Sequence, residues 1–327
     1  MGENLVKTNI VVVCWNALEY TKTTIDSLFK TVKHPFYLTI IDNSSTDGTV
    51  KYLEKLKVPQ NCVGFHLTLN KDNVGYGGAV NQGYEISKQL GAEYTCICNN
   101  DLLFENGWLT HLEKVLISDE NIGILSTMRP SVHITHPYYE LTAKEVVDST
   151  PAEYSVSEEI DYFTKGRTWI EFLEDLKKIN DTRLITLKCP PEVAVTFCAL
   201  VNNRAIEKIG HLADPQFEKY GSEDADLSWS LNKAGYKCCI DNRIYTHHFR
   251  HKSITASNLD RAKYLKMNNR LFFKKWSNEI YSFLSRYTND ELRQKFNEEN
   301  DNDFWFLRFL NNNIQFWNGE KVMVTKR

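Results

Sequence analysis

The sequence predicts an α/β fold in which a mostly parallel sheet is flanked by helices. Three short runs are apolar almost throughout and end in polar residues: NIVVVCWN at 9–16, FYLTIIDNSS at 36–45 and EYTCICNND at 93–101. Continuous apolar runs of this length are typical of strands buried on both faces. A helical pattern at 79–90 precedes the third run. This alternation of strands and helices favours parallel strands joined by helical crossovers.

Further strands are predicted at 64–69, 122–127, 195–201 and 238–245. In the three runs quoted above, polar residues follow directly after the strand. Ligands of open α/β sheets bind beyond the carboxyl ends of the strands. Asp42 and Asp101 both lie at such ends, so that the pattern itself predicts a binding cleft there.

The chain has 327 residues, which at roughly 150 residues per domain corresponds to one large or two moderate domains. We expect one α/β domain over residues 1–257 and a C-terminal helical region over 258–327. The net charge is −3, which excludes the overall basic field that attracts nucleic acid. Partners therefore have to be inferred from individual sites.

None of the eight cysteines forms a C-x-x-C pair, so the usual zinc and thioredoxin spacings are missing. The N-terminus, MGENLVKTN, has no apolar signal region. No apolar run reaches the roughly 20 residues that span a bilayer. These features predict a soluble, cytoplasmic protein.

The regular pattern breaks between Arg129 and Pro191, where five prolines occur. The segment is too long for an ordinary loop, and we interpret it as an insertion, a lid or a small subdomain with one helix at 168–180. Near the C-terminus, four apolar residues fall on one helical face: Phe306, Leu310, Ile314 and Trp317. Core packing or a homo-oligomer contact is favoured for this face. Peripheral membrane binding is the alternative, which the scarcity of basic residues weakens.

Two polar segments carry candidate chemistry near the first strands. In IDNSSTDGT (41–49), Asp42 is a candidate for hydrogen bonding a base or ribose, although the segment taken alone favours a simple polar turn. In NKDNVGYGGAVNQG (70–83), Gly75, Gly77 and Gly78 would let the backbone approach a nucleotide closely. Val80 stands where a dinucleotide fingerprint has its third glycine, which argues against a nicotinamide enzyme.

Two later segments offer metal or phosphate ligands. CICNNDLLF (96–104) ends a strand in Asn99, Asn100 and Asp101, whose oxygens suit magnesium or manganese unless Asp101 merely caps a helix. YTHHFRHKS (245–253) contains three histidines, His247, His248 and His251, together with Arg250 and Lys252. Such a cluster marks a metal or phosphate site more often than a single histidine does.

The segment YGSEDADLSW (220–229) places three carboxylates at the start of a helical pattern. Ser222 is a candidate helix cap, the acids would interact with the positive end of the helix dipole, and the helix should end near Gly235. A structural role alone would account for these acids.

Seven motifs, taken in order, resemble those of family 2 inverting glycosyltransferases with the GT-A fold: VVVCWN, IDNSSTDGT, NVGYGGAVNQG, NND, TFCALVNNRAIEKIG, SEDADLSWSLNKAGYK and HHFRHKS. The resemblance covers about 8–253, interrupted by the 129–191 insertion, and is closest to the polysaccharide and rhamnosyltransferase-like branch. It implies a Rossmann-like GT-A sheet, a UDP- or dTDP-linked sugar as donor and a glycan or lipid-linked glycan as acceptor. It also implies a divalent metal, Mn²⁺ or Mg²⁺, at the diphosphate.

The resemblance implies roles for individual residues. Asp42 would hold the uracil or thymine side of the donor. The remaining donor-binding residues would be Asn16, Asn43, Asn73, Gly75, Gly78, Asn81, Asn99 and Asn100. Metal or diphosphate contacts would come from Asp101, His248 and His247. Asn99 stands where the family usually has the first aspartate of its D-x-D motif.

The resemblance also implies a role for each of the three acids in the segment 220–229. Asp224 matches the aspartate of the E-D motif and would be the catalytic base. Glu223 would orient it or contact the acceptor, whereas Asp226 would be a structural acid of the first helical turn.

Two other functions are weighed against this one. A non-catalytic sugar-nucleotide or glycan-binding module on the same fold is favoured by Asn99 and disfavoured by Asp224. A sugar-1-phosphate nucleotidyltransferase is less favoured, because the segment after the first strand, CWNALEYTKTT, lacks the expected glycines.

Overall fold

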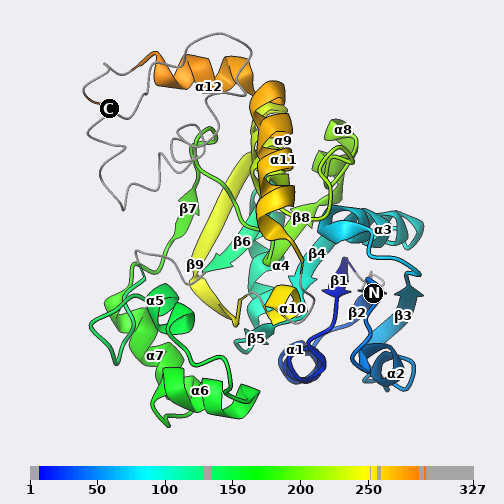
Figure 1. Ribbon diagram of the computed structural model, residues 1–327, viewed down its shortest axis with the longest axis vertical. Helices are drawn as coiled ribbons and strands as arrows, with labels where there is room; N and C mark the ends of the chain where they lie inside the picture. The colour runs from blue at the N-terminus through cyan, green and yellow to red at the C-terminus, as the bar shows by residue number, and fades with distance from the viewer. Residues whose placement is uncertain (1–6, 129–133, 251, 256–258, 287–290, 292–327) are drawn as a thin grey trace.

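A computed structural model describes residues 7–128, 134–250, 252–255, 259–286 and 291. Figure 1 shows a central sheet with helices around it. Within the described residues the strands are β1 (Thr8–Cys14), β2 (Phe36–Asp42), β3 (Cys62–Leu69), β4 (Tyr94–Asn99), β5 (Leu102–Phe104), β6 (Ile122–Met128), β7 (Leu184–Thr186), β8 (Cys198–Asn202) and β9 (Lys237–His248).

The strand order is β3-β2-β1-β4-β8-β6-β9-β5, and β7 pairs with β9 outside this path. Strands β1 to β4 run parallel to one another, and β6 runs parallel to β9. Strand β8 is antiparallel to both of its neighbours, β4 and β6. The predicted α/β fold with a mostly parallel sheet is therefore confirmed.

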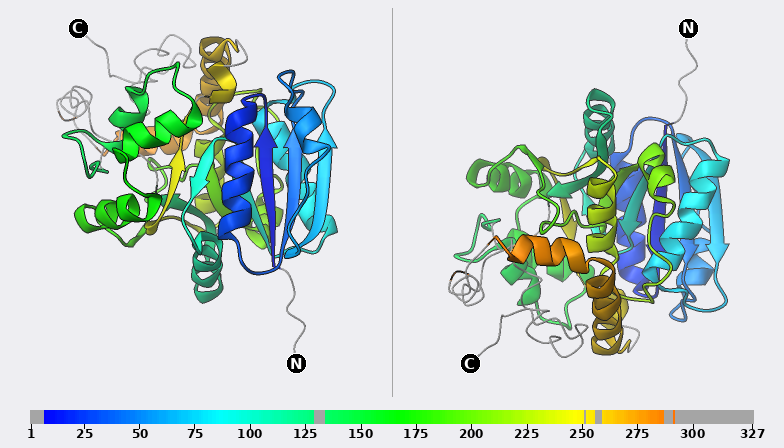
Figure 2. Two further views of the ribbon diagram at one scale, coloured as in Figure 1. Left: turned by 90° about the horizontal axis from the view of Figure 1, so that it is seen from below. Right: turned by 90° about the horizontal axis from the view of Figure 1, so that it is seen from above.

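The helices lie on both sides of this sheet (Figure 2). They are α1 (Leu18–Thr31), α2 (Thr49–Leu53), α3 (Gly75–Gln89), α4 (Trp108–Ser118), α5 (Ala143–Asp148), α6 (Val156–Thr164), α7 (Trp169–Ile179), α8 (Asn203–Ile209), α9 (Glu223–Lys233), α10 (Lys252–Thr255), α11 (Arg261–Lys275) and α12 (Ser277–Leu284). None of the helices in the described part of the chain has the length and apolar character needed to cross a membrane.

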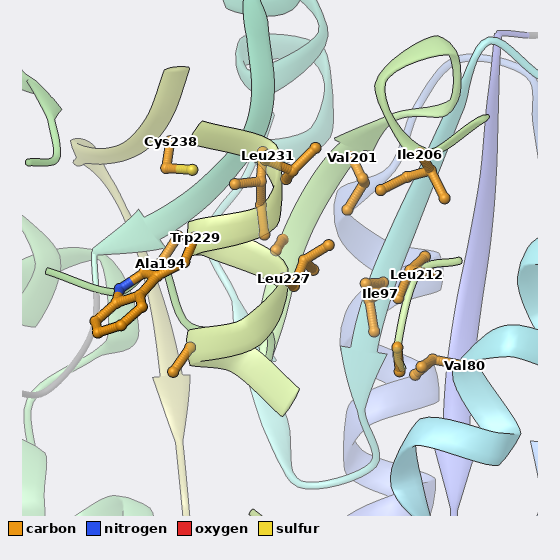
Figure 3. Close-up of a cluster of buried hydrophobic side chains, with 14 of the residues drawn as sticks. Val80, Ile97, Ala194, Val201, Ile206, Leu212, Leu227, Trp229, Leu231 and Cys238 are labelled. Atoms are coloured by element: carbon orange, nitrogen blue, oxygen red, sulfur yellow. The ribbon is translucent and has the colours of Figure 1, made fainter. Parts of the chain in front are cut away.

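Successive residues of β1 supply both faces of the sheet, because side chains alternate along a strand. Val11 and Val13 belong to a hydrophobic cluster with α3, α8 and α9, whereas Ile10 and Val12 belong to a second cluster with α1 and α4. Figure 3 shows part of the first cluster, in which side chains of α9 lie together with those of the sheet. The continuous apolar runs are thus explained by burial on both faces.

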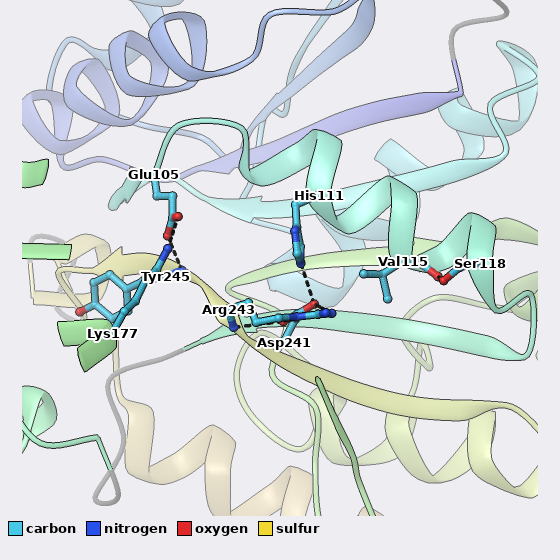
Figure 4. A network of polar contacts seen from close by, with 8 residues as sticks. All are labelled: Glu105, His111, Val115, Ser118, Lys177, Asp241, Arg243 and Tyr245. Carbon is cyan, nitrogen blue, oxygen red and sulfur yellow. Dashed lines mark hydrogen bonds and ion pairs between the residues drawn. The ribbon is translucent and has the colours of Figure 1, made fainter. Parts of the chain in front are cut away.

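The predicted insertion contains α5, α6, α7 and β7, and its apolar side chains form a small hydrophobic cluster together with Met128 of β6 and Tyr245 of β9. Each of its helices begins with a capping box, in which Thr142, Ser155 and Thr168 are the cap residues. The helix expected at 168–180 is confirmed as α7. Ion pairs also join this region to the sheet, since Lys177 of α7 contacts Glu105 just after β5 (Figure 4).

A second polar network in Figure 4 fixes the middle of β9. The Asp241 carboxylate is fully buried and accepts hydrogen bonds from Arg243 Nε at 2.7 Å and Nη2 at 2.6 Å. His111 Nε2 of α4 lies 3.0 Å from Asp241 Oδ2. A buried carboxylate is stable only when it is paired in this way.

The C-terminal helices pack on the same core as α9. Phe272, Trp276 and Ile280 lie in one hydrophobic cluster with Trp229 of α9. The described part of the C-terminal region is helical, as predicted. The apolar face predicted from Phe306 to Trp317 lies outside the described residues.

Candidate functional site

A cavity of about 510 Å³ opens where β1, β4 and β9 end and where α9 begins. Strand β8 is antiparallel, so its first residues reach the same edge of the sheet. The sequence-predicted residues that line this cavity are Asn43, Asn73, Asn99, Asn100, Asp101, Glu223, Asp224 and His248. Segments from five distant parts of the chain therefore meet here, at the edge where ligands of α/β sheets bind.

The two acids at the start of α9 face the cavity side by side. The Thr196 hydroxyl donates a hydrogen bond to Asp224 Oδ1. Burial, together with the negative charge of Asp224, raises the pKa of Glu223 to about 8. Glu223 therefore holds its proton at neutral pH. Two neighbouring carboxyl groups with different protonation states are the arrangement expected of an acid–base site.

Ser222 does not cap α9 with its side chain, and that prediction is wrong. Its backbone has a left-handed conformation, with φ of 73°. In this conformation the Ser222 hydroxyl donates to Asn269 Oδ1 of α11 at 2.9 Å. The helix ends at Lys233, two residues before Gly235, close to the predicted end.

Asp226 lies in the first turn of α9, as expected, but it also has buried partners. Its Oδ1 accepts a hydrogen bond from Trp276 Nε1 at 2.7 Å and lies 2.8 Å from Lys275 Nζ. The side chain is almost completely buried. Asp226 therefore joins α9 to α11 and stays outside the cavity lining.

Asn99, Asp101 and His248 also line this cavity and form a compact group. His248 Nε2 lies 3.0 Å from Asp101 Oδ1 and 3.2 Å from Asn99 Nδ2. Asn99 Oδ1 and Asp101 Oδ1 are buried and receive no well-directed hydrogen bond from the described residues. Buried oxygens without a donor, next to an imidazole nitrogen, fit a divalent cation.

This group alone supplies too few ligands to enclose a metal. The described residues contain no cluster of three or more His, Cys, Asp or Glu side chains with metal-binding geometry. Magnesium-type sites commonly use one or two carboxylates and complete the coordination with substrate phosphates and water. The donor set therefore fits a metal that is shared with a bound diphosphate.

His247 points away from this group. Its ring stacks on Phe163 of the insertion at a centroid distance of 4.0 Å, and its Nδ1 lies 3.0 Å from the Tyr245 hydroxyl. Burial lowers the pKa of His247 well below its usual value, so the ring is neutral. Adjacent residues of a strand face opposite sides, and His248 is the one that reaches the cavity.

The glycine-rich segment is folded around Asn43. Asn43 Nδ2 donates to Asn73 Oδ1 at 3.0 Å and to the Gly75 carbonyl at 3.1 Å, and its Oδ1 accepts from Val74 N at 2.9 Å. Gly75 has φ of +81°, and a Cβ there would lie 2.6 Å from Lys219 Cα. Glycine is therefore required at this position for the backbone to approach the loop before α9.

Several predicted donor-binding residues hold the backbone and do not line the cavity. Asn16 Oδ1 accepts from Thr46 N at 2.7 Å, and Asn81 bonds both backbone groups of Ala213. Gly78 lies within α3, beside Val74.

Asp42 is fully buried at the end of β2 and is likewise absent from the cavity lining. Its Oδ1 accepts from Ser45 N at 2.9 Å, while its Oδ2 receives no hydrogen bond from the described residues. Asp42 thus keeps one free acceptor oxygen near the cavity end of the sheet.

Sequence reasoning missed several residues of the cavity wall, among them Trp15, Tyr76, Thr196 and Lys219. Trp15 follows β1 directly, so its place at a strand end was a signal that could have identified it. The Tyr76 hydroxyl donates to the Thr196 carbonyl at 2.8 Å, a contact across 120 positions of sequence. No local pattern indicates such a contact.

Two cations of the cavity wall are paired with the insertion. Arg250 Nη1 lies 2.8 Å from Asp148 Oδ1, and Lys252 Nζ lies 2.6 Å from Glu159 Oε1. The predicted insertion therefore contacts the site through charges, although its sequence has none of the motifs quoted above.

Comparison with known proteins supports the same reading of the fold. The family model described as "Glycosyl transferase family 2" matches residues 9–210, well over half of the chain. No curated protein sequence matches the chain significantly.

Two solved structures resemble this chain in fold. The mannosyltransferase PcManGT from Pyrobaculum calidifontis, in complex with GDP-Man and Mn²⁺, is 13% identical with a TM-score of 0.52, and the similarity covers 85% of this chain and 65% of that one. GalNAc-T7 with UDP, GalNAc and Mn²⁺ is 14% identical with a TM-score of 0.51, covering 76% of this chain and 44% of that one. The chain thus spans less than two thirds of the length of either protein. On the family match and the shared GT-A fold, the chain belongs to glycosyl transferase family 2.

Proposed function

We propose that this chain transfers a sugar, with inversion, from a nucleoside diphosphate sugar to a hydroxyl group of a glycan or lipid-linked glycan. The observation that carries the proposal is that one cavity is lined both by the Asp224 carboxylate and by the Asn99, Asp101 and His248 group. A donor whose diphosphate lies at the second group would present its sugar toward the first. Membership of the family supports the same reaction class.

Asp224 is the proposed base. Glu223 holds a proton at neutral pH because burial and the charge of Asp224 raise its pKa to about 8. The negative charge of the pair then lies on Asp224, where the Thr196 hydroxyl stabilises it. Asp224 takes the proton of the acceptor hydroxyl while that oxygen forms its bond to the anomeric carbon. The bond from the anomeric carbon to the diphosphate breaks, and the diphosphate leaves with the electron pair.

A positioned base contributes typically 10²–10⁴-fold to a rate. Placement of donor and acceptor in one cavity contributes the larger part. Glu223 holds its proton at neutral pH and is therefore a poor nucleophile for a covalent route with retention. Single displacement therefore fits the pair best.

Asp101, Asn99 and His248 are the proposed holders of a divalent metal, Mn²⁺ or Mg²⁺. Their buried oxygens without donors support this assignment, as does the Mn²⁺ named for both similar structures. When bound, the metal would neutralise charge on the departing diphosphate. Arg250 and Lys252 line the same cavity, each paired with a carboxylate of the insertion.

The nucleotide would lie along the Asn43 and Asn73 side of the cavity. Asp42 directly precedes Asn43, and its buried Oδ2 has no hydrogen-bond partner among the described residues, so it could accept from an N–H of a pyrimidine base if binding exposed it. Trp15 lines the same cavity with an aromatic ring. A UDP- or dTDP-linked donor fits this acceptor. The similar structures contain UDP in one case and GDP-Man in the other, so GDP belongs among the nucleotides tested.

Thermal unfolding with UDP, dTDP and GDP, each with Mn²⁺ or with chelator, tests the donor site. A nucleotide at 100 times its dissociation constant stabilises the protein by about 2.7 kcal/mol. We expect a metal-dependent increase in melting temperature with UDP or dTDP. No increase with any nucleotide would refute the donor site.

Asp224→Asn tests the reaction itself. The variant should keep the nucleotide-induced melting shift, while release of nucleoside diphosphate from a panel of UDP-, dTDP- and GDP-sugars should fall by about 10²–10⁴-fold. Wild-type turnover in the variant would remove Asp224 from the mechanism. Nucleotide binding without any turnover by the wild-type protein would favour a sugar-nucleotide-binding module.

A further inference from the structure

The loop that leads into the proposed base is held by α11, a helix outside the residues matched by the family model. Asn268 of α11 is completely buried. Its Nδ2 lies 2.6, 2.9 and 3.0 Å from the carbonyl oxygens of Glu218, Tyr220 and Gly221, which share its two N–H donors. Its Oδ1 accepts from Glu218 N at 3.0 Å. One side chain thus binds four backbone groups of a four-residue loop.

The backbone of this loop is unfavourable on its own. Lys219, Gly221 and Ser222 all have positive φ angles, of 45°, 94° and 73°. Such conformations cost free energy in residues other than glycine and persist only where surrounding contacts impose them. The Asn268 side chain supplies those contacts.

Neighbouring residues of α11 add to the same support. Asn269 Oδ1 accepts a hydrogen bond from the Ser222 hydroxyl at 2.9 Å. Leu265 Cδ1 lies 2.7 Å from the place where a Cβ on Gly221 would be, so the loop passes directly over α11. Glu223 and Asp224 follow this loop immediately.

Helix α9 is also fixed from its far side by α11. Asp226, two residues after Asp224, contacts Lys275 Nζ and Trp276 Nε1 at 2.8 and 2.7 Å. The first turn of α9, with the proposed base, is therefore held between two anchors on a single helix. Figure 1 shows α9 and α11 beside each other.

We infer that Asn268 is a positioning residue that sets the location of the Asp224 carboxylate in the cavity, an inference that rests on the proposed function. It has no contact with the cavity itself, since it is absent from the lining. Its effect on the reaction would pass through the backbone of the loop. A displacement of the base by about 1 Å can cost about 10²-fold in rate.

The first test measures the loop without reference to activity. Trypsin cleaves after Lys219 when the loop opens. We expect cleavage at this bond to be at least about fivefold faster in Asn268→Ala. The loss of even one net hydrogen bond raises the equilibrium constant for local opening of the loop by about that factor. Asn278→Ala, the same change at an exposed position of α12, should be cleaved like the wild-type protein.

An isosteric variant separates hydrogen bonding from packing. Asn268→Asp keeps the side-chain volume but replaces the donor with an acceptor that faces three carbonyl oxygens. We expect cleavage after Lys219 to be at least as fast as in Asn268→Ala.

The second test measures turnover. Release of nucleoside diphosphate at saturating nucleotide sugar should fall by about 10²-fold in Asn268→Ala, while the UDP-induced and Mn²⁺-dependent melting shift and the KM for the nucleotide sugar stay at the wild-type values. If Asn268 had a purely structural role, Asn268→Ala would lower the turnover and the nucleotide-induced melting shift together. If Asn268→Ala does not unfold cooperatively, Asn269→Ala decides instead, with a smaller fall in turnover and an unchanged melting shift.

Faster cleavage with lowered turnover and intact nucleotide binding supports the inference. Cleavage or turnover equal to that of Asn278→Ala overturns it. Failure of the proposed function has a different signature, namely a wild-type protein that releases no nucleoside diphosphate although its Lys219 bond is protected.

Discussion

Replacing Glu223 by glutamine tests the charge state of the acid pair at the start of α9. Burial and the neighbouring charge of Asp224 raise the pKa of Glu223 to about 8. The side chain is therefore neutral at pH 7 and becomes charged only in alkaline solution. Glutamine has the same shape and cannot become charged.

The sign and size of the effect follow from the two pKa values. The unfolded carboxyl titrates near 4.5, whereas the folded one keeps its proton up to about pH 8. Between these pH values the folded state binds more protons, so the free energy of unfolding falls as the pH rises. At about 1.36 kcal/mol per pH unit the loss is at most about 5 kcal/mol. Water in the cavity screens the charge, and we expect roughly 2–3 kcal/mol.

Urea unfolding at pH 5, 7 and 9 measures this loss. We expect Glu223→Gln to gain stability relative to the wild-type protein between pH 5 and pH 9, by the amount given above. Glu218→Gln, the same change at an exposed position of the adjacent loop, should show no such gain. In an Asp224→Asn background the gain should shrink, because one cause of the raised pKa is removed. A stability difference for Glu223→Gln that is the same at all three pH values would refute the reasoning.

Three further predictions use the same measurements. Asp101→Ala should abolish the Mn²⁺ dependence of the UDP-induced melting shift, and an unchanged dependence would exclude Asp101 as a metal ligand. Gly75→Ala should destabilise the protein by about 1–3 kcal/mol more than Gly91→Ala in urea unfolding. Both glycines have positive φ, but of the two only Gly75 has backbone atoms within 3 Å of the added Cβ. Equal losses of stability would contradict the close approach at Gly75. Burial would raise the pKa of Asp241, but hydrogen bonds from Arg243 outweigh it and lower that pKa. The charged Asp241 therefore stabilises the fold above its unfolded pKa, and this contribution is lost as the pH falls. Asp241→Asn should cost about 3–5 kcal/mol at pH 7. The free energy of unfolding of this variant should also depend less on pH between pH 3 and 6 than that of the wild-type protein.

The strands and the position of the cleft could be predicted because their causes are local. Runs such as 9–14 alternate side chains between two hydrophobic clusters, and a strand buried on both faces has to be apolar throughout. Asp101 could be named because a strand end is readable as a sequence pattern, whereas only the resemblance to family 2 glycosyltransferases distinguished Asp224 from the other acids of its helix start. That they face one cavity follows from the geometry of an α/β sheet.

The orientation of single side chains could not be predicted in this way. His247 and His248 are adjacent, and the register of β9 against β5 decides which of them reaches Asp101. Asn16 and Asn81 are polar residues in suggestive segments, yet their side chains bond backbone groups 30 and 132 positions away. Hydrogen-bond partners at such distances leave no trace in a local pattern.

The sequence by itself therefore determined the α/β fold, the helix of the insertion and the residue types gathered at one sheet edge. The tertiary structure alone decided that Glu223 is neutral beside Asp224, that Thr196 and Tyr76 complete the wall and that Asn268 holds the loop before the base. The physical reason is that hydrophobic periodicity depends on near neighbours in the chain. Protonation, capping and positioning depend on groups that only folding brings within hydrogen-bond distance.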